Sequence, residues 1–245
     1  MLLVTYNEER RIATCLRDVV PWVDEVIIVD QSSSDATRAI AAQVLEQMST
    51  RPDASRSPSQ RWQIVLDEHR GYCEASRAIA AHYQTAAWTL VLDADETLSD
   101  PFKRHLRELI RQAQARGWHG YRLKRATSVD GECFHRPDDV HFRLFRRSSA
   151  NYLDILHSAP QPRGNKPLGP TPEYICIEHH KTLQEELEDE LRYEQIIAEQ
   201  TQTPEWKAER LAWNVYLRAQ REQLPAAEVE RLRRASTENN TIPRL

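Results

Sequence analysis

The sequence predicts an α/β fold in which a doubly wound, mostly parallel sheet is followed by a helical C-terminal segment. Short apolar runs alternate with helix-patterned segments along the first part of the chain. The run DEVIIVD at 24–30 is almost continuously apolar, which is typical of a strand buried on both faces of a parallel sheet. The repeated order of strand and helix favours parallel strands with helices on both sides.

The first half of the chain supplies the alternating strands and helices. The second helix follows small polar residues, of which Ser34 or Asp35 is expected to be the N-cap. The stretch 49–61 is rich in proline and serine and has no periodicity, so it is expected to be a mobile inserted loop. Strands are expected at 1–6, 24–30, 62–66 and 88–95, and helices at 7–20, 32–48 and 73–84.

The second half divides into the end of this domain and a separate helical segment. The strand VHFRLFRR at 140–147 alternates in hydrophobicity and is expected to be half-exposed. From 182 to 245 the chain is helical and charged, which separates it from a domain at 1–181. A small apolar stripe in this segment predicts packing on the sheet or a homodimer contact, with a membrane surface as the alternative. A helix is also expected at 101–116, strands at 120–126 and 175–180, and a loop at 131–139.

Composition and charge exclude several classes of function. The 245-residue chain has a net charge of -4 and therefore no basic excess to neutralise nucleic-acid phosphates. Its four cysteines form no CxxC pair and are expected to be reduced. No apolar run approaches the ~20 residues of a membrane span, and no charged segment precedes the first strand as in a signal peptide. We therefore expect a cytoplasmic protein, with peripheral contact to the inner face of the membrane as the alternative.

Polar side chains follow three of the four predicted parallel strands. They are Thr5-Tyr6-Asn7-Glu8 after the first strand, Asp30 at the end of the second, and Asp93-x-Asp95 at the end of the fourth. Ligands of such sheets bind beyond the carboxyl ends of the strands. This convergence predicts a ligand site at that edge of the sheet.

The stretch LVLDADET allows a phosphatase as one interpretation. Haloacid-dehalogenase-like phosphatases use the pattern DxDxT, in which the first aspartate attacks phosphorus and the second protonates the leaving group. That motif normally lies on the first strand of its domain, whereas three α/β units precede it here. The acidic pair Asp138-Asp139 follows no apolar strand, so this interpretation is the less favoured one.

A clamp for a metal and a nucleotide sugar is the favoured interpretation of the same acids. Alternate residues of a strand point the same way, so Asp93 can face ribose or metal while Asp95 reaches the metal. Hard cations such as Mg²⁺ and Mn²⁺ prefer oxygen ligands and take some of them from phosphates. Such a cation stabilises the charge that develops on a departing diphosphate. Asp30 can then accept hydrogen bonds from the base or ribose.

The order of these motifs resembles the family-2 glycosyltransferases of GT-A fold. The resemblance rests on LLVTYNEERRIATCLRDVVPWVDEVIIVDQSSSDAT and WTLVLDADETLSD, and continues through GYRLKR and RPDDVHFRLFRR to IEHHK. It covers roughly residues 1–181 and is nearest to bacterial enzymes related to lipopolysaccharide-core β-glucosyltransferases. The resemblance implies an inverting, metal-dependent transfer of a hexose from a nucleotide sugar, usually a uridine one. The implied acceptor is a glycan, lipid-linked or peptide group, as in cell-envelope glycan synthesis.

The same resemblance implies a role for individual residues. Asp30 would contact the uridine, Asp93 the ribose or the metal, and Asp95 the metal. The family's catalytic base would fall on Asp138 or Asp139, since an acceptor hydroxyl must lose its proton as it attacks. The remaining implied contacts are Thr5, Tyr6, Asn7 and Glu8 around the base, Arg70 or Arg77 on the diphosphate, and His179 or His180 on the metal or diphosphate.

This sequence departs from the family pattern at several positions. The loop that usually reads DSGSTD is DQSSSD, which places Gln31 and Ser32 after Asp30. The usual Arg-Asn before the third helix is Ser76-Arg77, and the usual HE is His157-Ser158. A fold that binds sugar or serves as a scaffold without turnover is therefore the alternative. Metal-dependent donor hydrolysis would favour the enzyme, and loss of metal-dependent donor binding would favour the scaffold.

Overall fold

The computed structural model describes residues 1–49, 61–134, 139–153, 159–186 and 188–189. The chain divides into two compact units, Met1–His180 and Lys181–Leu245. In the second unit the described part starts a helix, where Thr182 and Glu185 cap each other's backbone N–H groups. The rest of the predicted C-terminal segment, and with it the predicted dimer or membrane contact, lies outside the described residues, as does most of the loop 49–61.

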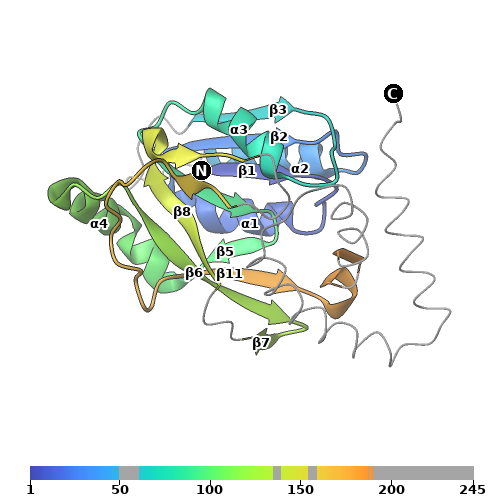
Figure 1. The fold of residues 1–245 in the computed structure, drawn as a ribbon. Coiled ribbons are helices and arrows are strands. Elements are labelled where there is room, and N and C mark those ends of the chain that lie inside the picture. Colours follow the sequence, from blue (N-terminus) through green and yellow to red (C-terminus); the bar gives the residue numbers. More distant parts are fainter. Residues whose placement is uncertain (50–60, 135–138, 154–158, 187, 190–245) are drawn as a thin grey trace. The chain divides into compact units, whose positions relative to one another are not determined.

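The first unit is built around a mixed sheet that the described residues form from nine strands (Figure 1). Its order is β3-β2-β1-β4-β8-β6-β11-β5, with β7 beside β6. The first four of these are parallel to one another, and β8 and β6 continue the sheet in antiparallel fashion. The strands are β1 (Leu2–Thr5), β2 (Glu25–Asp30), β3 (Arg61–Leu66), β4 (Trp88–Asp93), β5 (Glu96–Leu98), β6 (Gly120–Val129), β7 (Glu132–Phe134), β8 (Val140–Arg146) and β11 (Cys176–Lys181). A separate ribbon pairs β9 (Ala150–Asn151) with β10 (Gln161–Pro162).

Helices cover both faces of this sheet. The helices are α1 (Ile12–Val19), α2 (Thr37–Ser49), α3 (Glu74–Tyr83) and α4 (Asp100–Arg116), with short 3₁₀ turns at Val20–Trp22 and Arg147–Ser149. One core cluster joins α1, α2 and α4 to alternate strand residues such as Leu3 and Ile28. The other joins α3 to the intervening residues such as Leu2 and Ile27. The predicted α/β class, with helices on both sides of parallel strands, is confirmed.

The ends of α4 follow from local sequence. Ser99 precedes the helix and its Oγ accepts a hydrogen bond from the Phe102 N–H, as expected of an N-cap. Gly117 ends the helix in the left-handed conformation, with φ of 68°, which glycine adopts without steric cost. The buried stripe of this helix consists of Phe102, Leu106, Leu109 and Ala113. The helix thereby delivers the chain to the start of β6.

Strand β8 differs from its prediction. It is buried along Phe142–Phe145 rather than half-exposed, because it lies between β4 and β6 with both faces covered. Tyr121 pairs with Leu144 and Arg122 with Phe142, so Arg143 is an extra residue that forms a β-bulge. The bulge turns Arg143 out of the regular alternation. It also explains why Phe142 and Phe145 stack with ring centroids 4.5 Å apart, although they are three positions apart. The predicted loop at 131–139 contains β7 at its start.

Gly120, where β6 begins, offers a test of how tightly β6 packs on β8. A Cβ at this position would lie 2.6 Å from Phe145 Cβ and 2.7 Å from the Leu144 carbonyl oxygen. Since backbone cannot yield, we expect Gly120→Ala to lower the free energy of unfolding by about 2–3 kcal/mol. Chemical denaturation would measure it. Gly117→Ala is the matched control, because a Cβ there meets open space and costs only the left-handed φ, about 1 kcal/mol. Equal losses in the two variants would contradict the close packing.

Candidate functional site

The loops after β1 and β2 are tied together by side chains from both. The Asn7 N–H donates to Ser33 Oγ at 2.9 Å, and the Ser34 N–H donates to Asn7 Oδ1 at 2.9 Å. The Glu8 N–H donates to Thr37 Oγ1 at 2.7 Å, at the first residue of α2. Asn7 has φ of 53°, a conformation that asparagine tolerates better than most residues. The residues predicted to border a nucleobase therefore also hold the start of α2 in place.

Asp30 is enclosed by the loop that follows it. Its side chain is fully buried, and its carboxylate accepts hydrogen bonds from Ser33 N at 2.9 Å and Ser33 Oγ at 2.6 Å. Arg38 Nε lies 3.5 Å from Oδ1. In this arrangement Asp30 shapes the loop, and contact with a nucleoside requires that loop to shift.

A carboxylate that sequence reasoning missed follows β3. Asp67 accepts two hydrogen bonds from Arg70, at 2.6 and 3.2 Å, and one from Ser76 Oγ at 2.6 Å. Burial would raise the pKa of Asp67, but the bonds from Arg70 and Ser76 lower it below its ordinary value. Arg70, the predicted diphosphate ligand, is held by this carboxylate. The sequence could have indicated Asp67, because this residue directly follows the predicted third strand, just as Asp30 ends the predicted second strand.

Two of the departures from the family pattern, Gln31 and Ser76, meet beside this carboxylate. Gln31 Nε2 donates to Ser76 Oγ at 2.7 Å and to the Tyr72 carbonyl oxygen at 2.8 Å. Gln31 Oε1 lies 3.3 Å from Nδ1 of His69, whose ring stacks on Tyr6 with centroids 3.5 Å apart. The loops after β1, β2 and β3 are thus linked through buried and half-buried polar contacts.

Asp93, at the end of β4, lies between two buried arginines. Arg77 Nη2 is 2.8 Å from Oδ1, and Arg143 Nη2 is 3.1 Å from Oδ2. The pKa of Asp93, which burial alone would raise, is held well below its ordinary value by these two guanidinium groups. Asp93 is therefore ionised and already paired before any ligand binds.

Glu96 supports the turn that contains both predicted acids. It is fully buried, and its Oε2 accepts a hydrogen bond from the Asp93 backbone N–H at 2.9 Å. Its Oε1 is 3.1 Å from Arg143 Nη2 and 3.9 Å from Arg125 Nη1. Burial raises the pKa of Glu96, and Arg143 and Arg125 oppose that rise. The bulge on β8 thus places one guanidinium against both Asp93 and Glu96.

Asp95 faces His179, which comes from the last strand of the unit. Asp95 Oδ2 and His179 Nε2 are 3.2 Å apart, and both side chains are about nine-tenths buried. His179 Nδ1 lies 3.1 Å from Thr127 Oγ1, which fixes the orientation of the ring. His180, nominated by sequence together with His179, instead bonds Thr97 and Ser128 through its side chain. Arg11 Nη1 lies 3.9 Å from Asp95.

Asp95 and His179 are placed so that they could supply two of the ligands of a divalent cation. Two ligands at right angles and about 2.1 Å from a metal are about 3.0 Å apart, close to the observed separation. Within the described ranges, no group of three or more histidine, cysteine, aspartate or glutamate residues is arranged to hold a metal. Asp93, the third predicted ligand, is turned toward its arginines. Phosphate and water oxygens would therefore have to complete the coordination.

Asp139 lies immediately before β8 and is held from two sides. Arg125 Nε is 3.0 Å from Oδ2, and His141 Nε2 is 2.5 Å from Oδ1. Burial would raise the pKa of Asp139, but the bond from His141 and the charge of Arg125 hold it well below its ordinary value. Asp138, the other predicted base, lies outside the described residues, as does His157.

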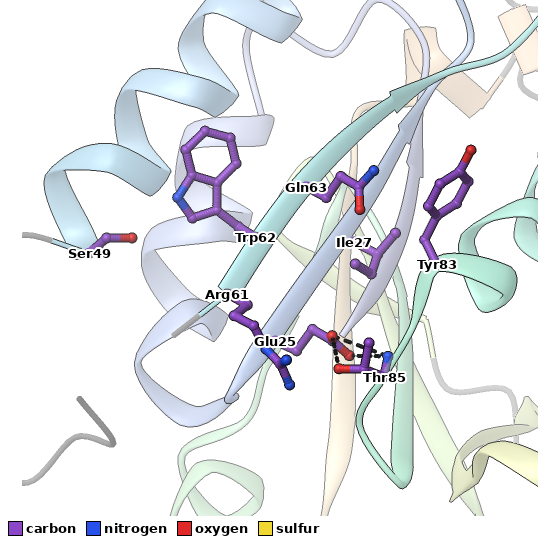
Figure 2. Close-up of a pocket in the computed structure, with 8 residues that line it drawn as sticks. All are labelled: Glu25, Ile27, Ser49, Arg61, Trp62, Gln63, Tyr83 and Thr85. Carbon is purple, nitrogen blue, oxygen red and sulfur yellow. Dashed lines mark hydrogen bonds between the residues drawn. The ribbon is translucent and has the colours of Figure 1, made fainter. Parts of the chain in front are cut away.

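The opposite edge of the sheet carries a pocket of about 450 Å³ (Figure 2). It is lined by Glu25, Ile27, Ser49, Arg61, Trp62, Gln63, Tyr83 and Thr85. Glu25 accepts hydrogen bonds from Thr85 N, Thr85 Oγ1 and Ala86 N, so its carboxylate is already used to anchor the turn after α3. The pocket lies at the amino ends of β2 and β3, away from the acids, so it is not the site predicted from the sequence.

Comparison with known proteins identifies the family. A profile described as glycosyl transferase family 2 matches residues 1–131. The chain belongs to glycosyl transferase family 2. The phosphatase interpretation is therefore not retained. The match spans β1 to β6, and with them Asp30, Asp67, Asp93 and Asp95.

Relatives that are named as glycosyltransferases and a solved structure of the same fold also match this chain. An uncharacterized glycosyltransferase of Rickettsia felis is 30% identical over 159 residues, which are 64% of this chain and 50% of that protein. One of Rickettsia typhi is 26% identical over 159 residues, 64% of this chain and 49% of that protein. The family-2 chain thus spans about half the length of these relatives. The crystal structure of S. aureus TarS 1-349 with UDP has a TM-score of 0.53 at 14% identity, covering 78% of this chain and 62% of that one, which shows the shared fold. None of the helices in the described part of the chain is long and apolar enough to cross a membrane.

The pairing of Arg143 with Glu96 can be tested by removing the arginine. In Arg143→Met a buried carboxylate loses its partner, and we expect a loss of about 3 kcal/mol in the free energy of unfolding near neutral pH. Without Arg143 the folded-state pKa of Glu96 rises further above its unfolded value. A carboxyl whose pKa is raised by folding lowers the stability of the fold at pH values where the carboxyl is ionised, and not where it is protonated. The loss of stability in Arg143→Met is therefore expected to be smaller at pH 5.5 than at pH 8.

Two further variants make this measurement specific. The double variant Arg143→Met, Glu96→Gln should recover at least half of the loss at pH 8, because the uncompensated charge is gone. Arg107→Met removes an ion pair with Asp24 in which both side chains are more than half exposed, and should change stability by less than about 1 kcal/mol. A loss in Arg143→Met that is the same at both pH values would show that packing, and not charge, accounts for the effect.

Proposed function

We propose that this protein is a glycosyltransferase that moves a hexose from a nucleotide sugar to an acceptor hydroxyl. The observation that carries the proposal is the meeting of Asp93-x-Asp95 and His179 at the edge where the loops after β1, β2 and β3 also lie. Membership of glycosyl transferase family 2 supports the reaction class. The donor in this proposal is a uridine nucleotide sugar, because TarS, with the same fold, was crystallised with UDP.

A divalent cation, Mn²⁺ or Mg²⁺, is part of the proposal. Asp95 and His179 would hold it, with Thr127 keeping the His179 ring in place. Asp93, which is paired with Arg77 and Arg143, would contact ribose or metal from that position. When bound, the cation would neutralise charge on the departing diphosphate. Arg77 and Arg143 keep Asp93 ionised, and Glu96 holds the backbone turn that separates Asp93 from Asp95.

The transfer in this proposal inverts the anomeric centre. The acceptor oxygen attacks the anomeric carbon from the face opposite the diphosphate, the bond to the diphosphate breaks, and the acceptor proton passes to a base. The acceptor is a glycan, lipid-linked or peptide group, as in envelope glycan synthesis. We place the reaction in the cytoplasm, with peripheral contact to the inner face of the membrane as the alternative. The free thiols of Cys15, Cys73 and Cys176 suit a reducing compartment.

A scaffold or sugar-binding protein of the same fold is the second candidate. The observation that favours it is that Asp30 is enclosed by its loop and Asp93 is already paired with two arginines. The two candidates separate on donor hydrolysis. Release of UDP from a UDP-sugar that depends on metal would support the enzyme, and binding without release would support the scaffold.

Metal-dependent nucleotide binding is the first prediction of this function. At a hundredfold excess over its Kd, UDP with Mn²⁺ stabilises the fold by ~2.7 kcal/mol, which corresponds to a rise in Tm of roughly 5–10 °C. A thermal-shift measurement with UDP, GDP and CDP, each with and without Mn²⁺, should show this rise for UDP with metal. Asp95→Asn should abolish it, while Asp100→Asn, an exposed control, should retain it. An Asp95→Asn protein that binds UDP and Mn²⁺ as tightly as wild type would refute the metal assignment.

The hydroxyl of Thr127 provides a second prediction. Thr127→Val keeps the shape of the side chain but removes the hydrogen bond to His179 Nδ1. We expect the affinity for Mn²⁺ in the presence of UDP to fall by about 10-fold or more, as for other partners that orient a metal-binding histidine. Titration calorimetry would measure it. Thr97→Val, which loses contacts to His180 and Glu178 instead, is the control and should leave the Mn²⁺ affinity unchanged.

A further inference from the structure

The start of β8 lies at the same edge of the sheet as the predicted donor site. β8 runs antiparallel to β4, with Trp88 opposite Arg146 and Leu90 opposite Leu144. The first residues of β8 therefore lie beside the carboxyl end of β4, where Asp93 is found. Asp139 lies immediately before this start and His141 lies in it, and their side chains meet at 2.5 Å.

One guanidinium group connects this pair to the donor side. Arg125 bonds Asp139 Oδ2 through Nε at 3.0 Å, and its Nη1 lies 3.9 Å from Glu96 Oε1. Glu96 in turn accepts the Asp93 backbone N–H. Since a guanidinium spans only a few ångströms, the Asp139–His141 pair lies next to the turn that carries the two predicted acids.

The two members of the pair differ in exposure and in what they bond. The side chain of Asp139 is 6% exposed and that of His141 is 31% exposed, so the imidazole is the group that an acceptor can reach. Both oxygens of Asp139 are bonded, one by Arg125 and one by His141. Among the described residues, none forms a hydrogen bond with His141 Nδ1. The geometry is that of a carboxylate orienting an imidazole.

The protonation states agree with this geometry. A carboxylate whose pKa lies far below the working pH is a weak base, because basicity falls with pKa. Burial lowers the pKa of His141 below its ordinary value, and Arg125 and Arg143 lower it further, although Asp139 acts in the opposite direction. A neutral imidazole at pH 7 has one nitrogen that can accept a proton.

We propose that His141 is the catalytic base that takes the proton of the acceptor hydroxyl, and that Asp139 is the residue that positions it. This rests on the proposed glycosyltransferase function. In the step, the acceptor O–H gives its proton to Nδ1 of His141 as its oxygen bonds to the anomeric carbon. The bond from that carbon to the diphosphate oxygen breaks, and the nucleoside diphosphate leaves with the electron pair. Nε2–H of the resulting imidazolium stays on Asp139, whose charge stabilises it.

Kinetics of variants provide the first test. The probe is UDP release from UDP-glucose and from UDP-N-acetylglucosamine with Mn²⁺, with water as the acceptor. His141→Gln keeps an N–H toward Asp139 but cannot take a proton, so UDP release should fall by about 100-fold or more while the Kd for UDP with Mn²⁺ stays within twofold. The fall in rate toward low pH should disappear in this variant, and added imidazole should restore part of the rate to His141→Ala. His105→Gln, on the exposed face of α4, is the control and should behave as wild type.

The tautomer of His141 provides a second test that needs no turnover. In ¹⁵N-labelled protein at pH 7.5, two-bond ¹H–¹⁵N correlations should show His141 neutral with its proton on Nε2. Asp139→Asn should lose this preference, and its UDP release should fall while UDP binding persists. A doubly protonated ring or a proton on Nδ1 in wild type would overturn the assignment, as would a His141→Gln protein that releases UDP within threefold of wild type.

These measurements separate the two proposals. If wild type binds none of the nucleotide diphosphates with metal, the glycosyltransferase proposal fails before His141 is at issue. If wild type binds UDP with Mn²⁺ and releases UDP from a donor, but His141→Gln does the same, only the role of His141 fails. If wild type binds UDP but releases none from a donor, the scaffold is supported and the role of His141 as a base fails together with the enzyme proposal.

Discussion

The candidate site depends on one buried interaction, the pairing of Arg143 with Glu96. Glu96 has no access to water, so a cation must lie beside it for its charge to be retained. Because the same guanidinium nitrogen also contacts Asp93, and Glu96 accepts the Asp93 backbone N–H, both the side chain and the backbone of Asp93 are held. Arg125 extends the network from Glu96 to Asp139. The side proposed to bind the donor and the side proposed to bind the acceptor therefore share one network of charges.

Much of the fold was predictable because its strands are short, apolar and separated by amphipathic helices. The periodicity around Ile12 and the continuous run at 24–30 predicted α1 and β2, and the parallel order then placed Asp30 and Asp93 at one edge. The same rule places Asp67, which follows β3, at this edge, although Asp67 was not among the predicted site residues. Strand β8 was wrongly expected to be half-exposed, because its arginines alternate with apolar residues. Its burial follows from its place between β4 and β6, which no local pattern reveals.

The sequence did not reveal which side chains contact Asp93 and Asp95. Asp93 and Asp95 are two residues apart, yet one faces arginines from α3 and β8 and the other faces His179 from β11. Those contacts span between 16 and 84 positions along the chain, so they depend on tertiary register. The bulge at Arg143 is a single inserted residue, and the arginine at this bulge contacts Asp93 and Glu96. Such an insertion leaves no mark in composition or periodicity.

The hydrogen bond between Gln31 and Ser76 has a consequence for exchanging segments between relatives. These residues stand where the family pattern differs. Gln31 supplies an amide donor on the loop after β2, and Ser76 supplies a hydroxyl acceptor in the first turn of α3. Ser76 passes the connection on to Asp67. Gln31 and Ser76 are therefore best exchanged together. A chimaera that replaces Gln31 alone or Ser76 alone would lose the hydrogen bond between them, which leaves Gln31 with the Tyr72 carbonyl or Ser76 with Asp67.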